Sequence, residues 1–384
     1  MNIKYIGFYD IENSKSDRVS NIAAIKKMDY ITNSLIKLGY NVEIISPSWM
    51  GINSKVKFEK KQVLKRKENL MITRCLSWYT KSKITEKIKI FYSLVWLFLY
   101  LLINTKKGEN ILVYHAEWLS YPIIMAKFIK RFELILEVEE IYSKVWKKSK
   151  SLEKMENRLL KSGDKYLFVS DELRKLFDIE DEKCTVLYGA YNVVEIEERK
   201  KFDKEYIDLI YAGSIDEVKG GAFKSLDIIL ELPSNYKLHI LGSGKEKSIK
   251  ALNNRIKEIN KIKNENVCYY SGVLHGKNFN NYLMKCDIAL NPQHIGDYMG
   301  TAFPSKIISY LSHNLHVVTT PIKSIKTSII KDYIVFANDD QTQSFIEAIE
   351  SVNLADENFT TNIVKNLDEK FMAELNELIK YKIK

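Results

Sequence analysis

Short apolar runs alternate with amphipathic helical stretches along nearly the whole chain. Residues 3–8 predict a buried strand, residues 21–38 a helix that ends at Gly39, and residues 41–46 the next strand. This alternation is typical of βαβ units, in which helices cover a sheet of parallel strands. Further strands of the first half are predicted at 111–114, 133–139, 165–169 and 184–188.

The alternation starts again after residue 200. The second half predicts strands at 206–214, 236–244, 267–271, 286–291 and 315–319, with helices at 221–231, 245–260, 276–285 and 304–313. A chain of 384 residues exceeds the size that one hydrophobic core usually supports, so two cores are expected. We therefore predict an α/β fold with two Rossmann-like, doubly wound domains.

The domain boundaries follow from this division. The charged segment 195–205 is the predicted linker, so the N-terminal domain covers residues 1–195 and the C-terminal domain residues 196–355. Residues 356–384 predict a C-terminal helix that can pack back on the N-terminal domain. The basic stretch 57–70 has few turn residues and is predicted to be a surface excursion.

The positive charge is concentrated in the first half. Residues 1–190 contain 34 Lys and Arg against 23 Asp and Glu, a net charge of +11, whereas residues 191–384 carry −1. This asymmetry favours an anionic partner, unless it only reflects a lysine-rich composition on a solvated surface. Only 8 of the 59 basic residues are arginine, the usual reader of bases and phosphates. We therefore expect no nucleic acid partner and favour an anionic membrane surface.

One apolar segment needs separate weighing. Residues 90–103 carry no charge over 14 positions, fewer than the roughly 20 that cross a bilayer. Lysines flank the segment on both sides. It is predicted to be a buried helix, an apolar face that touches a membrane, or a dimer contact. The flanking lysines are Lys87, Lys89, Lys106 and Lys107.

Cysteine usage and the N-terminal sequence bear on the compartment. The four cysteines are far apart and form no C-x-x-C pair, which argues against a disulfide framework and a zinc ribbon. No secretory signal is visible, because the first residues lack a basic region followed by an apolar stretch. A cytoplasmic protein is expected, at the inner face of the cytoplasmic membrane if the basic half binds lipid.

Glycines recur where the predicted strands of the second half end. They are Gly213, Gly242, Gly244 and Gly272, with Gly220 and Gly221 just before a predicted helix. Ligands of open parallel sheets bind at the carboxyl ends of the strands, where loops and helix N-termini present backbone N–H groups. Each glycine alone is explained by turn chemistry. Together they favour a nucleotide-type ligand.

The order and spacing of four segments resemble the donor domain of two-domain (GT-B) glycosyltransferases, above all glycosyltransferase family 4 and related bacterial polysaccharide enzymes. These segments are AGSIDEVKGGAFKSLDIIL (212–230), KLHILGSGKEKSI (237–249), NVCYYSGVLHGKNFNNYLMKCDIALNPQ (266–293) and FPSKIISYLSHNLHVVTT (303–320). In the first half, KYLFVSDELRKLF and CTVLYGAYN resemble the end of the acceptor domain. The resemblance implies a nucleotide-sugar cleft between two domains and a donor that is a nucleotide diphosphate sugar.

The resemblance assigns donor-binding roles to several positions. Lys219 matches the lysine that faces the diphosphate, and the alternative is a solvated lysine at a helix start. Ser214 stands where the family has an arginine after the strand-ending Gly213. Gly242 matches the loop beside the donor. Gly272 and Val273 match the loop that holds the base, and Asn291 and His294 lie in the loop that surrounds the sugar.

The largest departure from the family concerns a pair of glutamates. Thr301 and Ser309 occupy these two positions, so both carboxylates are absent. Some relatives carry P-x-K at the following helix start, and Pro304, Ser305 and Lys306 fit that variant. In that case Lys306 and the helix N-terminus face phosphate.

The acceptor side of the predicted site lies in the first half. Glu139 and Glu140 follow a predicted strand, where relatives carry residues that face the acceptor, and a carboxylate there can orient or deprotonate a hydroxyl. The alternative is a salt-bridged pair at a strand end. Ser20 and Asn21 begin a helix and are small enough to admit a ligand. The six histidines show no metal-ligand spacing and no D-x-D motif occurs, so neither a metal nor a cofactor is expected.

Taken with the resemblance, these residues predict a bacterial glycosyltransferase of capsule or other polysaccharide biosynthesis. It would transfer a hexose, most simply from a UDP-sugar and with retention of configuration, to a hydroxyl of a cell-surface polysaccharide or lipid-linked glycan. Two alternatives stay open. The missing glutamates fit a catalytically silent GT-B homologue that binds or stabilises a partner, and a nucleotide-sugar epimerase shares the same architecture.

Overall fold

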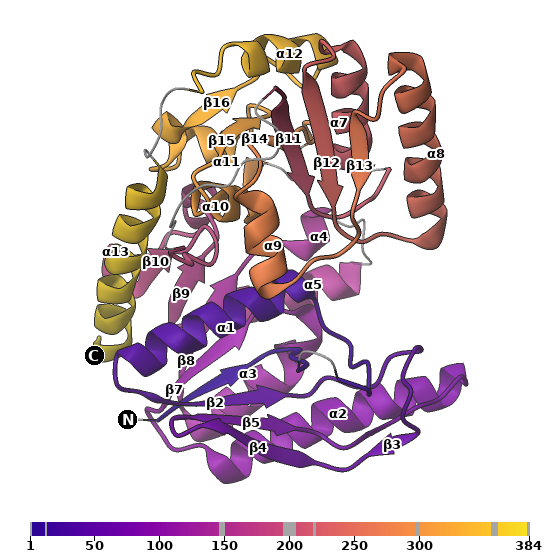
Figure 1. Ribbon diagram of the computed structural model, residues 1–384. Helices are drawn as coiled ribbons and strands as arrows, with labels where there is room; N and C mark the ends of the chain where they lie inside the picture. Colours follow the sequence, from indigo (N-terminus) through magenta and orange to yellow (C-terminus); the bar gives the residue numbers. More distant parts are fainter. Residues whose placement is uncertain are drawn as a thin grey trace. The chain divides into compact units, whose positions relative to one another are not determined.

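The computed structural model describes residues 2–11, 14–145, 150–194, 205–217, 220–296, 300–354 and 360–381. The chain forms two compact units, each built around one mainly parallel sheet (Figure 1). The first unit comprises Met1–Val169, Leu173–Ala190 and Lys370–Lys384, and the second comprises Ser170–Glu172 and Tyr191–Glu369. Two doubly wound sheets are therefore confirmed.

The first unit contains an eight-stranded sheet in the order β10-β9-β8-β7-β1-β2-β5-β4. All neighbouring strands pair in parallel except β4 and β5, which are antiparallel. The strands are β1 (Asn2–Ile6), β2 (Asn41–Ser46), β4 (Gln62–Lys67), β5 (Leu70–Arg74), β7 (Asn110–Tyr114), β8 (Glu133–Val138), β9 (Lys165–Phe168) and β10 (Cys184–Val186). Two short strands, β3 (Phe58–Glu59) and β6 (Ser77–Trp78), form a separate antiparallel pair.

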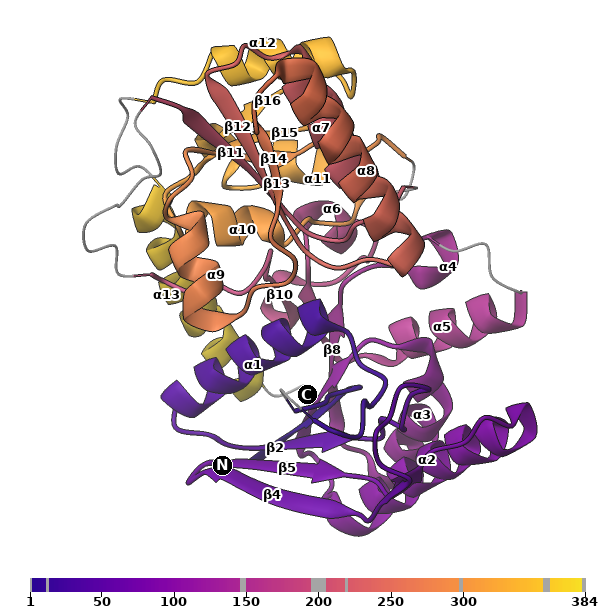
Figure 2. The same cartoon turned by 45° about the vertical axis from the view of Figure 1, so that its right-hand side comes forward.

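Helices cover both faces of the first sheet (Figures 1 and 2). On one face lies α1 (Ile22–Lys37), joined by the last turns of α13 (Thr360–Lys380), where the Phe371 ring lies 5.7 Å from that of Tyr30. On the other face lie α2 (Lys83–Asn104), α3 (Ser120–Lys130) and α5 (Lys150–Ser162). Shorter helices complete the unit: η1 (Glu117–Leu119), α4 (Tyr142–Val145), α6 (Asp171–Arg174) and η2 (Asp181–Lys183).

The second unit contains a six-stranded, fully parallel sheet in the order β13-β12-β11-β14-β15-β16. Its strands are β11 (Ile207–Ala212), β12 (Tyr236–Leu241), β13 (Cys268–Tyr270), β14 (Ile288–Asn291), β15 (His316–Thr319) and β16 (Ile334–Phe336). One face packs its core against α7 (Gly221–Glu231), α8 (Glu246–Lys263) and α12 (Thr342–Glu350). The remaining helices are α9 (Gly276–Leu283), α10 (Lys306–Leu311), α11 (Lys323–Lys326) and η4 (Lys331–Tyr333).

Two expectations about the first half are corrected. Residues 57–70 are not a plain surface excursion, because 62–67 form the edge strand β4 beside β5. Residues 90–103 belong to the longer helix α2, which buries only one side, at Lys89, Ser93, Leu97 and Leu101. The predicted linker 195–205 falls almost entirely outside the described residues. Within the part of the chain that the structure describes, no helix is both long and apolar enough to span a membrane.

Candidate functional site

Glycines hold three loops close together where β11, β12 and β13 end. The Gly213 N–H donates to the Leu241 carbonyl at 3.0 Å, and the Gly242 N–H donates to the Gly272 carbonyl at 2.8 Å. Gly242 has a φ of +139°, and a Cβ built there would overlap the Gly213 carbonyl oxygen. Only glycine fits this approach of two backbones. We call Gly213, Gly242 and Gly272 the glycine edge of the second sheet.

Lys306 places a positive charge against this edge. A Cβ built at Gly213 would lie 3.0 Å from the Lys306 Nζ, so the missing side chain of Gly213 leaves room for the ammonium group. The same Nζ lies 4.0 Å from the centre of the Tyr211 ring, within the range of a cation–π contact. Tyr310 fixes α10 beside β11, because its hydroxyl accepts from the Ala212 N–H at 2.8 Å. The lysine is therefore held at the end of β11.

His294 covers the start of α7. Gly220 precedes this helix with a φ of +73°, and a Cβ there would lie 2.5 Å from the His294 Nε2. The His294 Nδ1 and the Lys224 Nζ each lie 3.4 Å from the Asp340 Oδ2. Burial raises the pKa of Asp340, but Lys224, the Ile295 N–H and His294 outweigh it, so this pKa lies below its ordinary value. An ionised carboxylate thus holds the imidazole over the helix N-terminus.

The Asn291 side chain links two strands of the second sheet. It is fully buried, and its Nδ2 donates to the Thr319 Oγ1 at 2.8 Å, which ties β14 to β15. Among the described residues, the Asn291 Oδ1 has no hydrogen-bond partner. The prediction that Asn291 lies in a sugar-surrounding loop is therefore wrong for its side chain, because the residue ends the strand and points inward.

Three of the remaining predicted donor residues make hydrogen bonds through their backbone oxygens. Ser214 accepts from the Tyr211 hydroxyl through its carbonyl at 3.0 Å, Thr301 accepts from the Ser170 Oγ at 2.6 Å, and Ser309 contacts the His313 Nδ1 at 2.6 Å, all through backbone oxygens. Pro304 and Ser305 precede α10, and Val273 is 44% exposed. Lys219 lies outside the described residues, as do residues 297–299 of the predicted sugar loop.

The predicted acceptor-side carboxylates follow β8 in the first unit. The Lys27 ammonium forms an ion pair with Glu139 and donates to the Leu187 carbonyl at 2.8 Å. The pair bridges α1 and the end of β8. Glu139 is therefore held in place, and both interpretations made from the sequence, a salt-bridged carboxylate and a group at the acceptor side, remain compatible with its position. Glu140 is half-buried.

Sequence reasoning missed Glu137, which lies in β8 two residues before Glu139. Its side chain is fully buried and accepts a hydrogen bond from the Tyr5 hydroxyl. Burial, followed by the charge of Glu139, raises the pKa of Glu137 to about 8. Glu137 thus keeps its proton at neutral pH. An acidic residue within an otherwise apolar strand was the signal that pointed to it.

Asn21 is the N-cap of α1, which begins at Ile22, and its side chain already accepts a hydrogen bond. Its Oδ1 accepts from the Ala23 N–H at 2.8 Å and so caps the helix. The exposed Ser20 lies beside it. Asn21 therefore has a local structural role.

A buried ion network shapes the loop before α1. The Arg18 guanidinium donates to the Glu59 carboxylate at 2.8 and 2.6 Å, and Arg74 donates to Glu59 at 3.0 Å and to Asp10 at 2.8 Å. The Arg18 N–H also donates to Asp10 at 3.0 Å. Glu59 of β3 thus pairs with two arginines near the carboxyl edge of the first sheet, and Asp10 pairs with Arg74, although the Arg74 Nε has no partner among the described residues.

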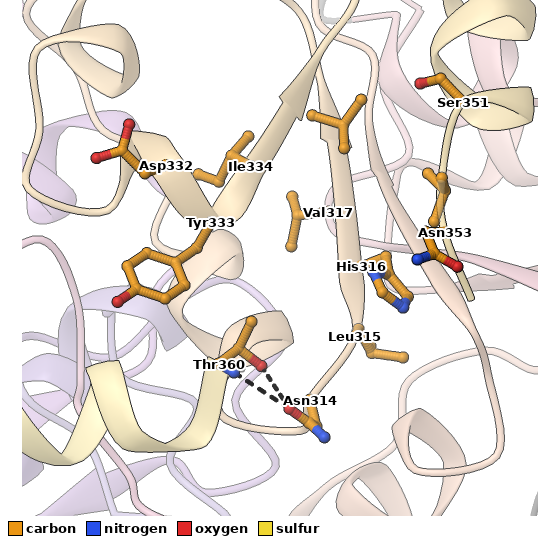
Figure 3. A pocket seen from close by; sticks show the side chains of 12 residues that line it. Asn314, Leu315, His316, Val317, Asp332, Tyr333, Ile334, Ser351, Asn353 and Thr360 are labelled. Atoms are coloured by element: carbon orange, nitrogen blue, oxygen red, sulfur yellow. Dashed lines mark hydrogen bonds between the residues drawn. The ribbon is translucent and has the colours of Figure 1, made fainter. Parts of the chain in front are cut away.

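A separate pocket of about 280 Å³ lies at the opposite end of the second sheet (Figure 3). Residues at the starts of β15 and β16 line it, and Asn314 accepts from the Thr360 N–H and hydroxyl at 3.3 and 2.9 Å. Thr360 directly follows residues outside the described part of the chain. Because ligands of parallel sheets bind at the carboxyl ends, we assign no ligand to this pocket. The described residues contain no cluster of His, Cys, Asp and Glu suited to a metal ion.

Comparisons with known proteins agree with this geometry. Residues 207–353, which contain the glycine edge, Lys306 and Asp340, match the family model described as Glycosyl transferases group 1. This part of the chain therefore carries a glycosyltransferase group 1 domain. No curated protein sequence matches the chain.

Solved structures of the GT-B fold match the chain over its whole length. One is a UDP-forming α,α-trehalose-phosphate synthase from Burkholderia xenovorans, with 10% identity, 99% of each chain covered and a TM-score of 0.68. A second trehalose-6-phosphate synthase, described in a study of glycosyl transfer with retention, gives 11%, 99% of each chain and 0.68. The lipopolysaccharide outer core galactosyltransferase WaaB gives 13%, 99% of each chain and 0.61. At these identities the likeness shows the fold.

Proposed function

We propose that the enzyme transfers a hexose from a nucleotide diphosphate sugar, with UDP as the nucleotide, to a hydroxyl of a cell-surface polysaccharide or lipid-linked glycan. The observation that carries this proposal is the Lys306 ammonium at the glycine edge, next to Gly213. The enzyme class comes from the group 1 match over residues 207–353. Donor, acceptor and stereochemistry are parts of the proposal.

The diphosphate is the leaving group of the proposed reaction, so its charge has to be stabilised by the protein. When the bond to the sugar breaks, negative charge grows on the leaving phosphate, and fixed positive groups stabilise it. Lys306 supplies a full charge, and the N-terminus of α7 supplies backbone N–H groups with a partial positive charge. His294 lies over that N-terminus, so it is placed to contact the sugar or the phosphate. Lys219, which precedes Gly220 in the sequence, would add a second charge.

This chemistry requires no metal ion. A lysine and helix N–H groups can neutralise the leaving group in place of a divalent cation. Thr301 and Ser309 offer no carboxylate to the ribose hydroxyls. We therefore expect the base and ribose to be held mainly by backbone groups near Gly272 and Val273.

UDP and retention are supported by the similar structures. One of them is named as UDP-forming, and another comes from a study of transfer with retention. WaaB, a lipopolysaccharide galactosyltransferase by name, supports a glycan acceptor at the cell surface. These are properties of those proteins, and we extend them here to this enzyme.

Glu139 is our candidate for the acceptor side. Its carboxylate is anchored by Lys27, which fixes its direction. Neighbouring Glu137 is protonated and hydrogen-bonded to Tyr5, so it adds no second charge beside Glu139. A single carboxylate is thus available to orient the acceptor hydroxyl.

The direct test is release of UDP from UDP-hexoses in the presence of soluble or lipid-linked glycan acceptors. Glu139→Gln should lower turnover about tenfold or more while leaving UDP affinity unchanged, since glutamine keeps the shape but cannot take a proton. Glu153→Gln, at an exposed position of α5, is the control and should behave as wild type. UDP binding without any acceptor-dependent release would contradict transfer and favour a binding subunit. Full activity of Glu139→Gln would exclude Glu139 and make Glu140 the next candidate.

A further inference from the structure

Helices α2 and α3 expose a continuous set of large apolar side chains. The two helices pack side by side on one face of the first sheet (Figures 1 and 2). The exposed apolar residues of the two helices and of η1, which we call the α2–α3 apolar face, are Ile84, Ile88, Phe91, Val95, Leu99, Ile103, Trp118 (η1), Tyr121, Met125, Phe128 and Ile129. Single exposed apolar residues are ordinary, but a patch that follows two neighbouring helices marks an interaction surface.

The stripe on α2 runs nearly the whole helix. Its six members recur every three or four residues from Ile84 to Ile103, which places them on one side over about 28 Å. Phe91 is 70% exposed and Ile103 is 79% exposed. On α3 the corresponding extreme is Phe128, at 84%. Rings of this size are seldom left in water unless a partner covers them.

The opposite side of α2 is fixed in the protein. Lys89 is buried and its ammonium donates to the Met50 carbonyl at 2.7 Å, and Ser93 donates to the Pro47 carbonyl. Leu97 and Leu101 are fully buried on the same side. Because these contacts fix the rotation of α2, the apolar stripe cannot turn inward. The helix can only present it sideways to an outside partner.

The charges around the face identify the partner. Residues 79–108 contain six lysines and one glutamate, and that glutamate, Glu86, forms an ion pair with Lys89 at 2.7 Å. The exposed lysines gather at the two ends of the stripe: Lys81, Lys83 and Lys87 at one end and Lys106 and Lys107 at the other. A second copy docked on this face would bring like charges together at the rim of the contact. An anionic lipid surface matches both the apolar centre and the basic rim.

We propose that the α2–α3 apolar face docks on an anionic membrane, with its rings in the outer part of the bilayer and its lysines at the headgroups. The arrangement is that of an interfacial helix, in which the apolar face enters the lipid and the basic residues stay at the surface. The inference goes beyond the proposed function and uses none of the donor-site residues. It gives the enzyme a defined side from which to meet a lipid-linked acceptor.

The test is vesicle flotation of the full-length protein. Vesicles of phosphatidylcholine alone are compared with vesicles containing 30% phosphatidylglycerol, at 50 mM and 500 mM salt, roughly above and below a Debye length of 10 Å. We expect binding to the anionic vesicles at low salt and at least a fivefold loss at high salt. Phe91→Glu/Phe128→Glu should abolish flotation. Ile262→Glu, at a position of α8 that is 61% exposed, should leave it unchanged.

The outcomes are separable from those of the donor site. All substituted positions are exposed, so circular dichroism and UDP binding should match wild type and report a folded protein. The proposal is overturned if the protein ignores anionic vesicles at low salt, or if the double variant floats as well as wild type. It is also overturned if light scattering shows a dimer that Phe91→Glu/Phe128→Glu converts to a monomer, because the face would then bind a second copy.

Discussion

The carboxyl edges of the two sheets differ in composition: charged side chains dominate the first, and glycines dominate the second. In the first unit, ion pairs line the edge: Arg18 and Arg74 share Glu59, Arg74 also pairs with Asp10, and Lys27 pairs with Glu139. In the second unit, glycines bring bare backbone together and one lysine lies over an aromatic ring. Two sheets of the same kind thus end differently: at the first edge charged side chains pair with one another, and at the second edge the glycines bring main-chain segments close together. The second kind suits an anionic ligand that must approach the main chain closely.

The strongest test of the first edge removes its central arginine. Arg18 is buried, and Arg18→Met would leave Glu59 with Arg74 as its remaining ion-pair partner and remove the donors to the Ser48 and Cys75 carbonyls, at a cost of about 3 kcal/mol. Arg255→Met is the matched control, because its ion pairs in the second unit are exposed and worth under about 1 kcal/mol. Urea unfolding of both variants measures the difference. Equal losses would show that the first edge does not depend on its ion network.

The glycine edge is tested by comparing two glycines with positive φ. Gly242→Ala adds a Cβ that overlaps the Gly213 carbonyl oxygen, whereas Gly272→Ala adds one with no atom within 4 Å. We expect a loss of about 3 kcal/mol or more for Gly242→Ala, and about 1 kcal/mol from backbone strain alone for Gly272→Ala. Thermal unfolding measures both. Similar losses would mean that the close approach of the two backbones contributes little.

The buried acid of the first unit predicts a dependence of stability on pH. The folded-state pKa of Glu137, about 8, lies above its ordinary value of 4.5, so between these values the unfolded chain releases a proton that the folded protein keeps. Stability attributable to Glu137 is therefore greatest below pH 4.5 and falls as the pH rises toward 8. The slope is at most about 1.4 kcal/mol per pH unit. Urea unfolding at pH 5, 6, 7 and 8 should give a flatter profile for Glu137→Gln, and parallel profiles would refute the assignment.

Much of the fold could be predicted from the sequence, because periodicity is a local property. The strand and helix expected at 41–46 and 221–231 match β2 and α7 closely. The edge strand β4 was missed because Gln62–Lys67 is mostly exposed and charged, and only pairing with β5 makes it a strand. Which side of α2 is buried could not be predicted, because a run without charged residues does not show which side of a helix faces the solvent.

The candidate site was predictable only in part. Glycines at strand ends and a lysine at the start of α10 are visible as patterns, and the structure brings Gly213 and Lys306 together. The partners of Glu139 are not visible, because Lys27 lies 112 positions away in the sequence and meets it only when β8 and α1 come together. Asn291 shows the reverse error, a polar residue in a predicted loop that the fold directs inward.

The central claim is that the glycine edge and Lys306 bind the diphosphate of a nucleotide sugar, and calorimetric titration with UDP tests it most directly. Charge-assisted contacts to phosphate are worth about 1.5–3 kcal/mol, so Lys306→Ala should weaken UDP binding about tenfold or more. Lys250→Ala, at an exposed position of α8, should bind UDP as the wild type does. Unchanged affinity in Lys306→Ala, or no binding of UDP or any other nucleoside diphosphate by the wild type, would contradict the account.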